Sequence, residues 1–290
     1  MKTALKRILF CVLLSLVCIN GFSLSAFDYL QESIVNIITS ASVLQLVDYE
    51  YEERGALWGC LLQSGKTNSL RSEYQAGCEY IILAAADDIT IDVDMNIYQG
   101  TSTGNLIAQD TAADGTPVVI FTPQTTGQYT FTITNNSYYD AFVSVVVLKY
   151  NEYAAFSFDP LMEALSNILS AAELVSYYTI KIPENKWILF GGNVYDKSDT
   201  SVFNINLNEG TYIFMASGDN SIYDVDVDVI KQDYVDYTGG TSIAIKETST
   251  TNFDLAVFSN TGYEYNYLKA MNNWSYYGEG FVFAFLLQFF

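Results

Sequence analysis

The chain has 290 residues, of which 50% are hydrophobic and 15% aromatic, and it contains no histidine. Its 33 acidic residues outnumber its 13 basic residues, and the formal net charge is −20. A surface this acidic repels nucleic-acid phosphates and anionic lipid headgroups, so we expect no nucleic-acid partner, and cations are the favoured small ligands. Without histidine, a Ser-His-Asp triad, an HExxH motif and an ordinary zinc centre are excluded.

The first 26 residues have the layout of a secretory signal peptide. Three basic residues precede an apolar run from Ile8 to Ile19, and small residues follow at 23–26. The run is too short to span a bilayer, so we expect cleavage near residue 26 and no stable membrane span afterwards. The protein is predicted to be periplasmic, cell-surface or secreted. The cleaved chain would keep 10 basic and 33 acidic residues, a net charge of −23.

Two cysteines, Cys60 and Cys78, would remain after cleavage. In an oxidising compartment, a pair of cysteines with this spacing predicts one disulfide. No other cysteine and no histidine would be left to complete a metal site with them.

The remaining chain is a tandem duplication. DITIDVDMNIY at 88–98 matches NSIYDVDVDVI at 220–230, and FDYLQESIVNIITSA from Phe27 matches FDPLMEALSNILSAA from Phe158. Each copy is long enough to bury a core of its own. We therefore divide the chain into repeat 1, residues 27–157, and repeat 2, residues 158–290.

Each repeat begins with a predicted helix. Asp28 and Asp159 are suitable N-caps, and apolar residues then follow at helical spacing. The pattern next changes to period 2, broken by Gly- and Asp-containing turns. In repeat 1 it predicts strands near 56–63, 69–74, 79–86, 90–98, 105–109, 117–121, 128–134 and 141–149. The predicted fold is mainly β, with two tandem antiparallel β-sandwich (jelly-roll-like) domains, each preceded by a short amphipathic helix.

The segment AGCEYIILAAADDITIDVDMNIYQGTSTGNLIAQDT and the later VVIFTPQTTGQYTFTITN are similar to the bacterial pre-peptidase C-terminal (PPC) domain. The features that carry the resemblance are Gly77 with Tyr80, the strand Asp92-Val93-Asp94, the turn into Gly104–Ala108, and the hairpin Thr126–Phe131. The resemblance extends over residues 56–150 and, more loosely, over 187–290. It implies a jelly-roll sandwich that is not catalytic and that serves secretion or substrate binding.

Acidic residues gather in the loops predicted at one end of repeat 1. In an up-and-down run, the loops at 87–89, 110–116 and 135–140 emerge at the same end. They contain the candidate ligands Asp87, Asp88, Asp110, Asp114 and Asp140. Ca²⁺ takes six to eight oxygen ligands and would offset the repulsion between these carboxylates. The alternative is that aspartate occupies turns for backbone reasons.

A second candidate surface is aromatic and lies in repeat 2. Its residues are Tyr263, Tyr265 and Tyr267, which alternate along a predicted strand, and Trp274, Tyr276 and Tyr277, which follow closely. Exposed, they would form a platform on which sugar rings or a protein partner could stack. Buried, they would belong to the core or to the seam between the repeats.

These patterns predict an exported, non-catalytic binding, adhesion or envelope protein whose partner is a glycan or an envelope protein. Three alternatives remain open. The chain could be a purely structural envelope component, for which the aromatic residues would be buried. It could be an outer-membrane β-barrel. It could also be a hydrolase, which would need carboxylates that face each other across a cleft between the repeats.

Overall fold

The computed structural model describes residues 26–53, 55–172, 180–195, 198–199, 203–233, 242–246, 250–260 and 264–289. Residues 1–25, which contain nearly all of the predicted signal peptide, lie outside the described residues. Within the ranges given, neither the length nor the apolar character of any helix suffices to cross a membrane.

Repeat 1 is a helix followed by a β-sandwich. Its elements are α2 (Ala26–Ala41), β1 (Tyr49–Tyr51), β2 (Leu57–Leu62), β3 (Thr67–Tyr74), β4 (Tyr80–Ala86), β5 (Val93–Gln99), β6 (Leu106–Asp110), β7 (Val118–Phe121), β8 (Gly127–Asn135) and β9 (Ala141–Tyr150). One layer has the strand order β2-β9-β4-β7, with β1 paired to β9, and the other has the order β3-β8-β5-β6. The eight predicted strands correspond to β2–β9, whereas β1 was not predicted.

Repeat 2 has the same topology. Its elements are α3 (Asp159–Ala172), β10 (Ile180–Lys181), β11 (Trp187–Tyr195), β12 (Ser198–Asp199), β13 (Phe203–Asn206), β14 (Gly210–Gly218), β15 (Ile222–Asp233), β16 (Ser242–Lys246), β17 (Phe253–Asn260), β18 (Glu264–Ser275) and β19 (Glu279–Phe289). The order β11-β19-β14-β17 repeats the first layer of repeat 1, and β18, β15 and β16 repeat the second, with β12 and β13 paired to β18. The predicted fold class is therefore confirmed.

The two repeats share one ten-stranded sheet because β2 pairs antiparallel with β11. Trp58 lies opposite Phe190, and this pair is the centre of the seam. Leu57–Gly59 correspond to Leu189–Gly191 in the repeat alignment, and the first residue of each triplet pairs with the last residue of the other. The seam therefore has a local two-fold axis, like the isologous interface of a homodimer.

Side chains cross the seam as well as backbone hydrogen bonds. Trp187 belongs to repeat 2, but its Nε1 donates a hydrogen bond to the carbonyl oxygen of Ser69 in repeat 1 at 2.8 Å. Its ring packs edge-on against Trp58 and Phe131, with centroid distances of 6.4 and 5.7 Å. The cores of the two repeats are therefore continuous.

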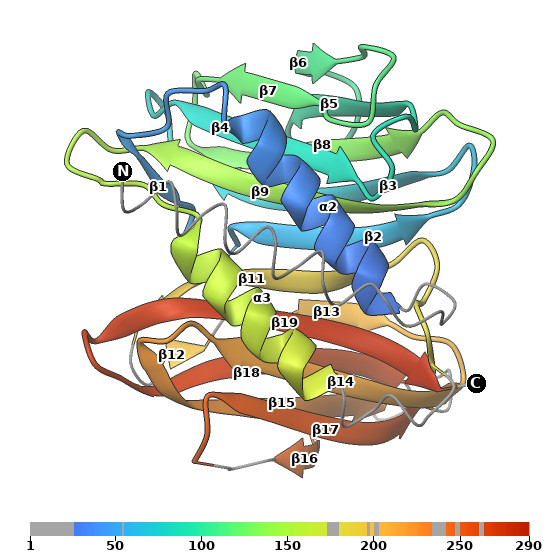
Figure 1. Ribbon diagram of the computed structural model, residues 1–290. Coiled ribbons are helices and arrows are strands. Elements are labelled where there is room, and N and C mark those ends of the chain that lie inside the picture. The colour runs from blue at the N-terminus through green and yellow to red at the C-terminus, as the bar shows by residue number, and fades with distance from the viewer. Residues whose placement is uncertain are drawn as a thin grey trace, which may run out of the picture.

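Both helices cover the same face of the ten-stranded sheet, as Figure 1 shows. The apolar residues that face the sheet are buried, as the helical spacing predicted; they are Leu30, Ile34, Ile37 and Ala41 in α2, and Leu161, Leu165 and Ile168 in α3. Helix α2 packs on β4 and β9, and α3 packs on β14 and β19. These strands lie between a helix and the second sheet layer, so their side chains are buried on both faces.

The predicted disulfide is wrong, because Cys60 and Cys78 are free thiols. Cys60 in β2 pairs with Val143 of β9, and Val143 pairs with Ala86 at the far end of β4. Cys78 precedes β4, so the cysteines are separated by one intervening strand and by roughly 20 Å along the strand direction. A disulfide needs Cα atoms within about 7 Å. Chain spacing and compartment do not reveal strand order.

Candidate functional site

The acidic loops of repeat 1 do meet at one end of the sandwich. The backbone N–H of Ala86 donates to the carbonyl oxygen of Gly115 at 2.8 Å, and that of Asn136 donates to Asp92 at 2.9 Å. These bonds tie together the three loops that the predicted up-and-down order placed side by side. That part of the prediction is confirmed.

The carboxylates in these loops are bound to backbone groups rather than gathered around a common point. Carboxylate oxygens accept backbone N–H bonds in each case: Asp88 from Thr90, Asp110 from Ala112 and Val118, Asp114 from Thr116, and Asp140 from Ser64. Across the described part of the chain, no three acidic or cysteine side chains come close enough to hold a metal ion. The loops therefore meet without grouping their carboxylates, and Asp88, Asp110 and Asp114 have the turn role that was the alternative to a Ca²⁺ site, which stays a prediction.

Asp87 has a structural role that the duplication repeats. Its Oδ1 accepts the backbone N–H of Phe142 at 3.0 Å, and in repeat 2 Asp219 accepts that of Phe281 at 2.9 Å. Each carboxylate thus fixes the start of the last strand of its repeat. Burial raises the pKa of Asp87 to about 6, against the effect of the hydrogen bond from Phe142.

Four aromatic side chains form an exposed cluster at one end of repeat 2. They are Tyr223, Trp274, Tyr276 and Tyr277, which we call the aromatic platform, and they are 36%, 54%, 66% and 85% exposed. The centroid of the Tyr223 ring lies 4.8 Å from that of Trp274 and 4.4 Å from that of Tyr276. Tyr277 extends the cluster, 6.3 Å from Tyr276. Aromatic side chains of this size are more often buried.

The platform forms where both strands break their alternation. On β15 the inward-facing residues Ile222 and Val225 are three positions apart, so Tyr223 and Asp224 both lie between two core positions. On β18 the buried residues Asn272 and Ser275 are also three positions apart, and Asn273 and Trp274 between them are exposed. The strand pairing is irregular at this point. Such bulges redirect side chains. Here they place Tyr223 and Trp274 of the platform, together with Asp224 and Asn273, outside the core.

Trp274 is an insertion relative to repeat 1. The turn reads NNSYY from Asn135 in repeat 1 and NNWSYY from Asn272 in repeat 2. The two asparagines are equivalent, because Nδ2 of Asn135 donates to the carbonyl of Leu62, and Nδ2 of Asn272 donates to that of the aligned Val194. Repeat 1 keeps the two exposed tyrosines of this turn but has no tryptophan beside them.

The structure regroups the aromatic residues that the sequence indicated. Trp274 and Tyr276 belong to the platform, together with Tyr277. Tyr267 is half-buried and lies seven residues from Trp274 along β18, roughly 23 Å away, so it is not part of the platform. Tyr263 lies outside the described residues, and only the backbone of Tyr265, within β18, is described.

Sequence reasoning missed Tyr223, because the gap-free repeat alignment places it opposite a core residue of repeat 1, Ile91. The signal that could have revealed the platform is the extra residue in NNWSYY. An insertion within a strand predicts a bulge and a change in the direction of neighbouring side chains.

Polar groups adjoin the platform. Nδ2 of Asn273 donates to Oδ2 of Asp224 and to Oδ2 of Asp226, both at 3.0 Å. The two carboxylates are two residues apart on one strand and share one amide group. They lie side by side and do not face each other.

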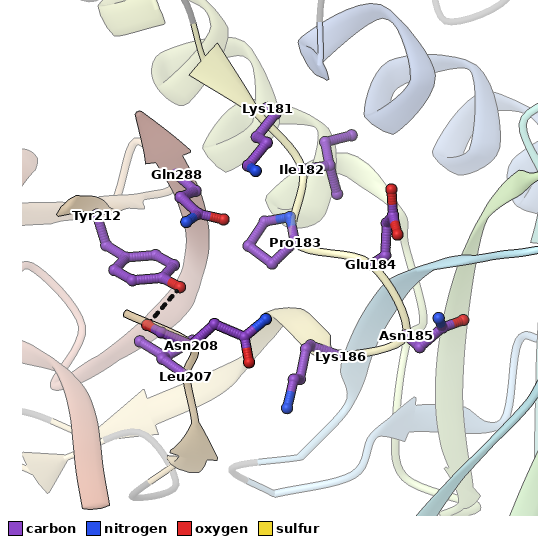
Figure 2. Close-up of a pocket in the computed structure, with 10 residues that line it drawn as sticks. All are labelled: Lys181, Ile182, Pro183, Glu184, Asn185, Lys186, Leu207, Asn208, Tyr212 and Gln288. Carbon is purple, nitrogen blue, oxygen red and sulfur yellow. Dashed lines mark hydrogen bonds between the residues drawn. The ribbon is translucent and has the colours of Figure 1, made fainter. Parts of the chain in front are cut away.

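A separate pocket of about 290 Å³ lies between the loop 181–186 and the start of β14. Figure 2 shows Tyr212 and Gln288 on one side of it and Pro183 on the other, with Tyr212 Oη donating to the carbonyl of Asn208 at 3.0 Å. The loop is anchored to repeat 1, because Asn185 Nδ2 donates to Gln63 Oε1 at 2.7 Å. The pocket therefore follows from the way the loop joins the two repeats.

Comparisons with known proteins identify no family. No protein-family model matches the sequence, and no curated protein matches it. A tandem CBM22 domain from Paenibacillus barcinonensis Xyn10C is 8% identical, with a TM-score of 0.24, over 78% of this chain and 82% of that one. The PBSX exported protein XepA is 9% identical, with a TM-score of 0.27, over 83% and 93%. These scores are too low to bear on function.

Proposed function

We propose that this chain is an exported, non-catalytic binding protein and that the aromatic platform is its ligand-binding surface. The observation that carries the proposal is the exposure of four aromatic side chains, three of which contact one another while Tyr277 contacts Tyr276. A purely structural component would be expected to bury them, since aromatic side chains contribute most to stability when water is excluded. Export rests on the signal-like first 26 residues.

The carboxylates beside the platform support a non-catalytic role. A glycosidase needs two carboxyl groups on either side of the bond that it cleaves. Asp224 and Asp226 lie on one strand and accept hydrogen bonds from the same amide of Asn273. Asp226 is buried, and Oδ1 of both carboxylates is inaccessible, so the pair does not flank a bond of a ligand on the platform. The resemblance to the PPC domain, whose members are mostly non-catalytic, remains a prediction that points the same way.

The test is binding of the fluorescently labelled chain, without the first 26 residues, to insoluble envelope material from the organism that produces it. A Trp274→Ala/Tyr276→Ala variant should lose most of the binding. The matched control is Tyr138→Ala/Tyr139→Ala, which changes two exposed tyrosines of the corresponding turn in repeat 1. The control should bind like the unmodified protein. Equal binding by all three proteins would refute the proposal.

A further inference from the structure

We infer that the ligand of the aromatic platform is an uncharged carbohydrate chain. This inference rests on the proposed function, because it assumes that the platform binds a ligand. Three observations select this class of ligand: the size of the platform, the spacing of its rings, and the charge of the residues beside it.

The platform is too small for a stable protein partner. Its four rings expose roughly 350–600 Å² in total, taking about 150–250 Å² for a whole aromatic side chain. A stable protein–protein interface needs about 800 Å² from each partner. The platform matches instead the faces of a few sugar rings laid end to end. Such rings present flat, weakly polar C–H surfaces that can pack on aromatic faces.

The rings are also too close together to form a cage around a cation. A cation bound between two aromatic faces sits several ångströms from each ring centroid. The Tyr223 centroid is only 4.4 Å from Tyr276 and 4.8 Å from Trp274, so these rings touch each other. What remains accessible is their outer surface, on which the planes of Trp274 and Tyr276 are tilted by 35°. A tilted surface of this kind suits a chain whose successive rings are twisted.

Charge and hydrogen bonding argue for an uncharged ligand rich in hydroxyl groups. Asp224 lies opposite Trp274 and is partly exposed, so uronate, sulfate or phosphate groups on a ligand would be repelled. Asn273 is exposed and directs its Nδ2 toward both carboxylates, which leaves its amide oxygen to accept a hydrogen bond. Sugar hydroxyls donate to such acceptors. Trp274, the inserted residue, is placed to provide the main stacking face.

The experiment uses the same envelope-binding assay, with the envelope first treated with periodate, which cleaves the vicinal diols of sugars, or with a broad protease. Binding that depends on the platform should be lost after periodate and kept after protease. It should fall by less than threefold in 1 M NaCl, because no ion pairs hold an uncharged ligand. A Trp274→Phe variant should retain binding within about threefold and Trp274→Ala should lose at least tenfold, because only phenylalanine keeps a stacking face.

The other outcomes separate the two proposals. Loss of binding after protease but not after periodate would overturn the carbohydrate inference and leave the platform as a protein-binding surface. A tenfold loss in 1 M NaCl would overturn the uncharged nature of the ligand. If untreated envelope binds the Trp274→Ala/Tyr276→Ala variant as well as it binds the unmodified protein, the proposed function itself fails.

Discussion

Replacing Trp187 by alanine should destabilise both repeats at once. This buried side chain of repeat 2 packs against Trp58 and Phe131 of repeat 1 and donates a hydrogen bond to Ser69. Truncation of a buried tryptophan costs about 3–5 kcal/mol of unfolding free energy. At about 2 °C per kcal/mol for a chain of this length, the melting temperature should fall by about 6–10 °C.

The assay is thermal unfolding followed by circular dichroism, with Trp274→Ala as the matched control. Both variants lose one tryptophan, but Trp274 is exposed and its removal should change the unfolding free energy by less than about 0.5 kcal/mol. The Trp187→Ala variant should keep a single transition, because the repeats share one sheet. A fall of less than 2 °C, or two transitions of which only one moves, would refute the idea of a continuous core.

Three further predictions concern individual residues. The raised pKa of Asp87, about 6, means that the folded state favours the protonated acid. As the pH falls from 7 to 4, the unmodified protein should therefore gain about 1–3 kcal/mol of unfolding free energy relative to Asp87→Asn. Urea unfolding at several pH values measures this, and a difference that does not change with pH would contradict it. Gly191→Ala should cost about 1–3 kcal/mol in urea unfolding, because the new Cβ would lie 2.5 Å from the backbone oxygen of Val282; an unchanged midpoint would contradict the close approach. Cys78 should react with a thiol reagent in the folded protein and Cys60 only after unfolding, since Cys60 is fully buried and burial raises its pKa to about 12; a thiol count of zero would restore the disulfide.

Most of the fold could be predicted because it depends on local periodicity. Alternation along Val93, Met95 and Ile97 is enough to identify β5 and its buried face, and the helical spacing from Leu30 to Ala41 identifies α2. The duplication then extends each assignment to repeat 2. Strand β1 was missed because three residues are too few to show a period.

The seam and the cysteines could not be predicted from such patterns. Pairing of β2 with β11 joins segments more than 120 residues apart, and nothing in either strand distinguishes that partner from others. The predicted disulfide relied on compartment and spacing. In the structure, β9 lies between β2, which contains Cys60, and β4, which follows Cys78.

The candidate site was predicted only in part. Trp274 and Tyr276 were identified as aromatic residues, but their exposure depends on a bulge that involves both strands. Tyr223 belongs to the other strand of that bulge, so its membership of the platform requires knowledge of strand pairing. The aspartates show the reverse case. Their number in adjacent loops suggested a metal site, whereas each carboxylate accepts a hydrogen bond from a backbone N–H group.

The insertion that creates the platform has a consequence for valency. A symmetric pair of identical subunits would present every surface twice and could bridge two ligand molecules. Here the tryptophan occurs in one repeat only, and the antiparallel pairing of β2 with β11 directs the corresponding turn of repeat 1, at Tyr138 and Tyr139, toward the opposite end of the molecule. Under the proposed function, one chain would therefore hold a ligand at a single point. Cross-linking of two ligand chains would then require a second molecule of the protein.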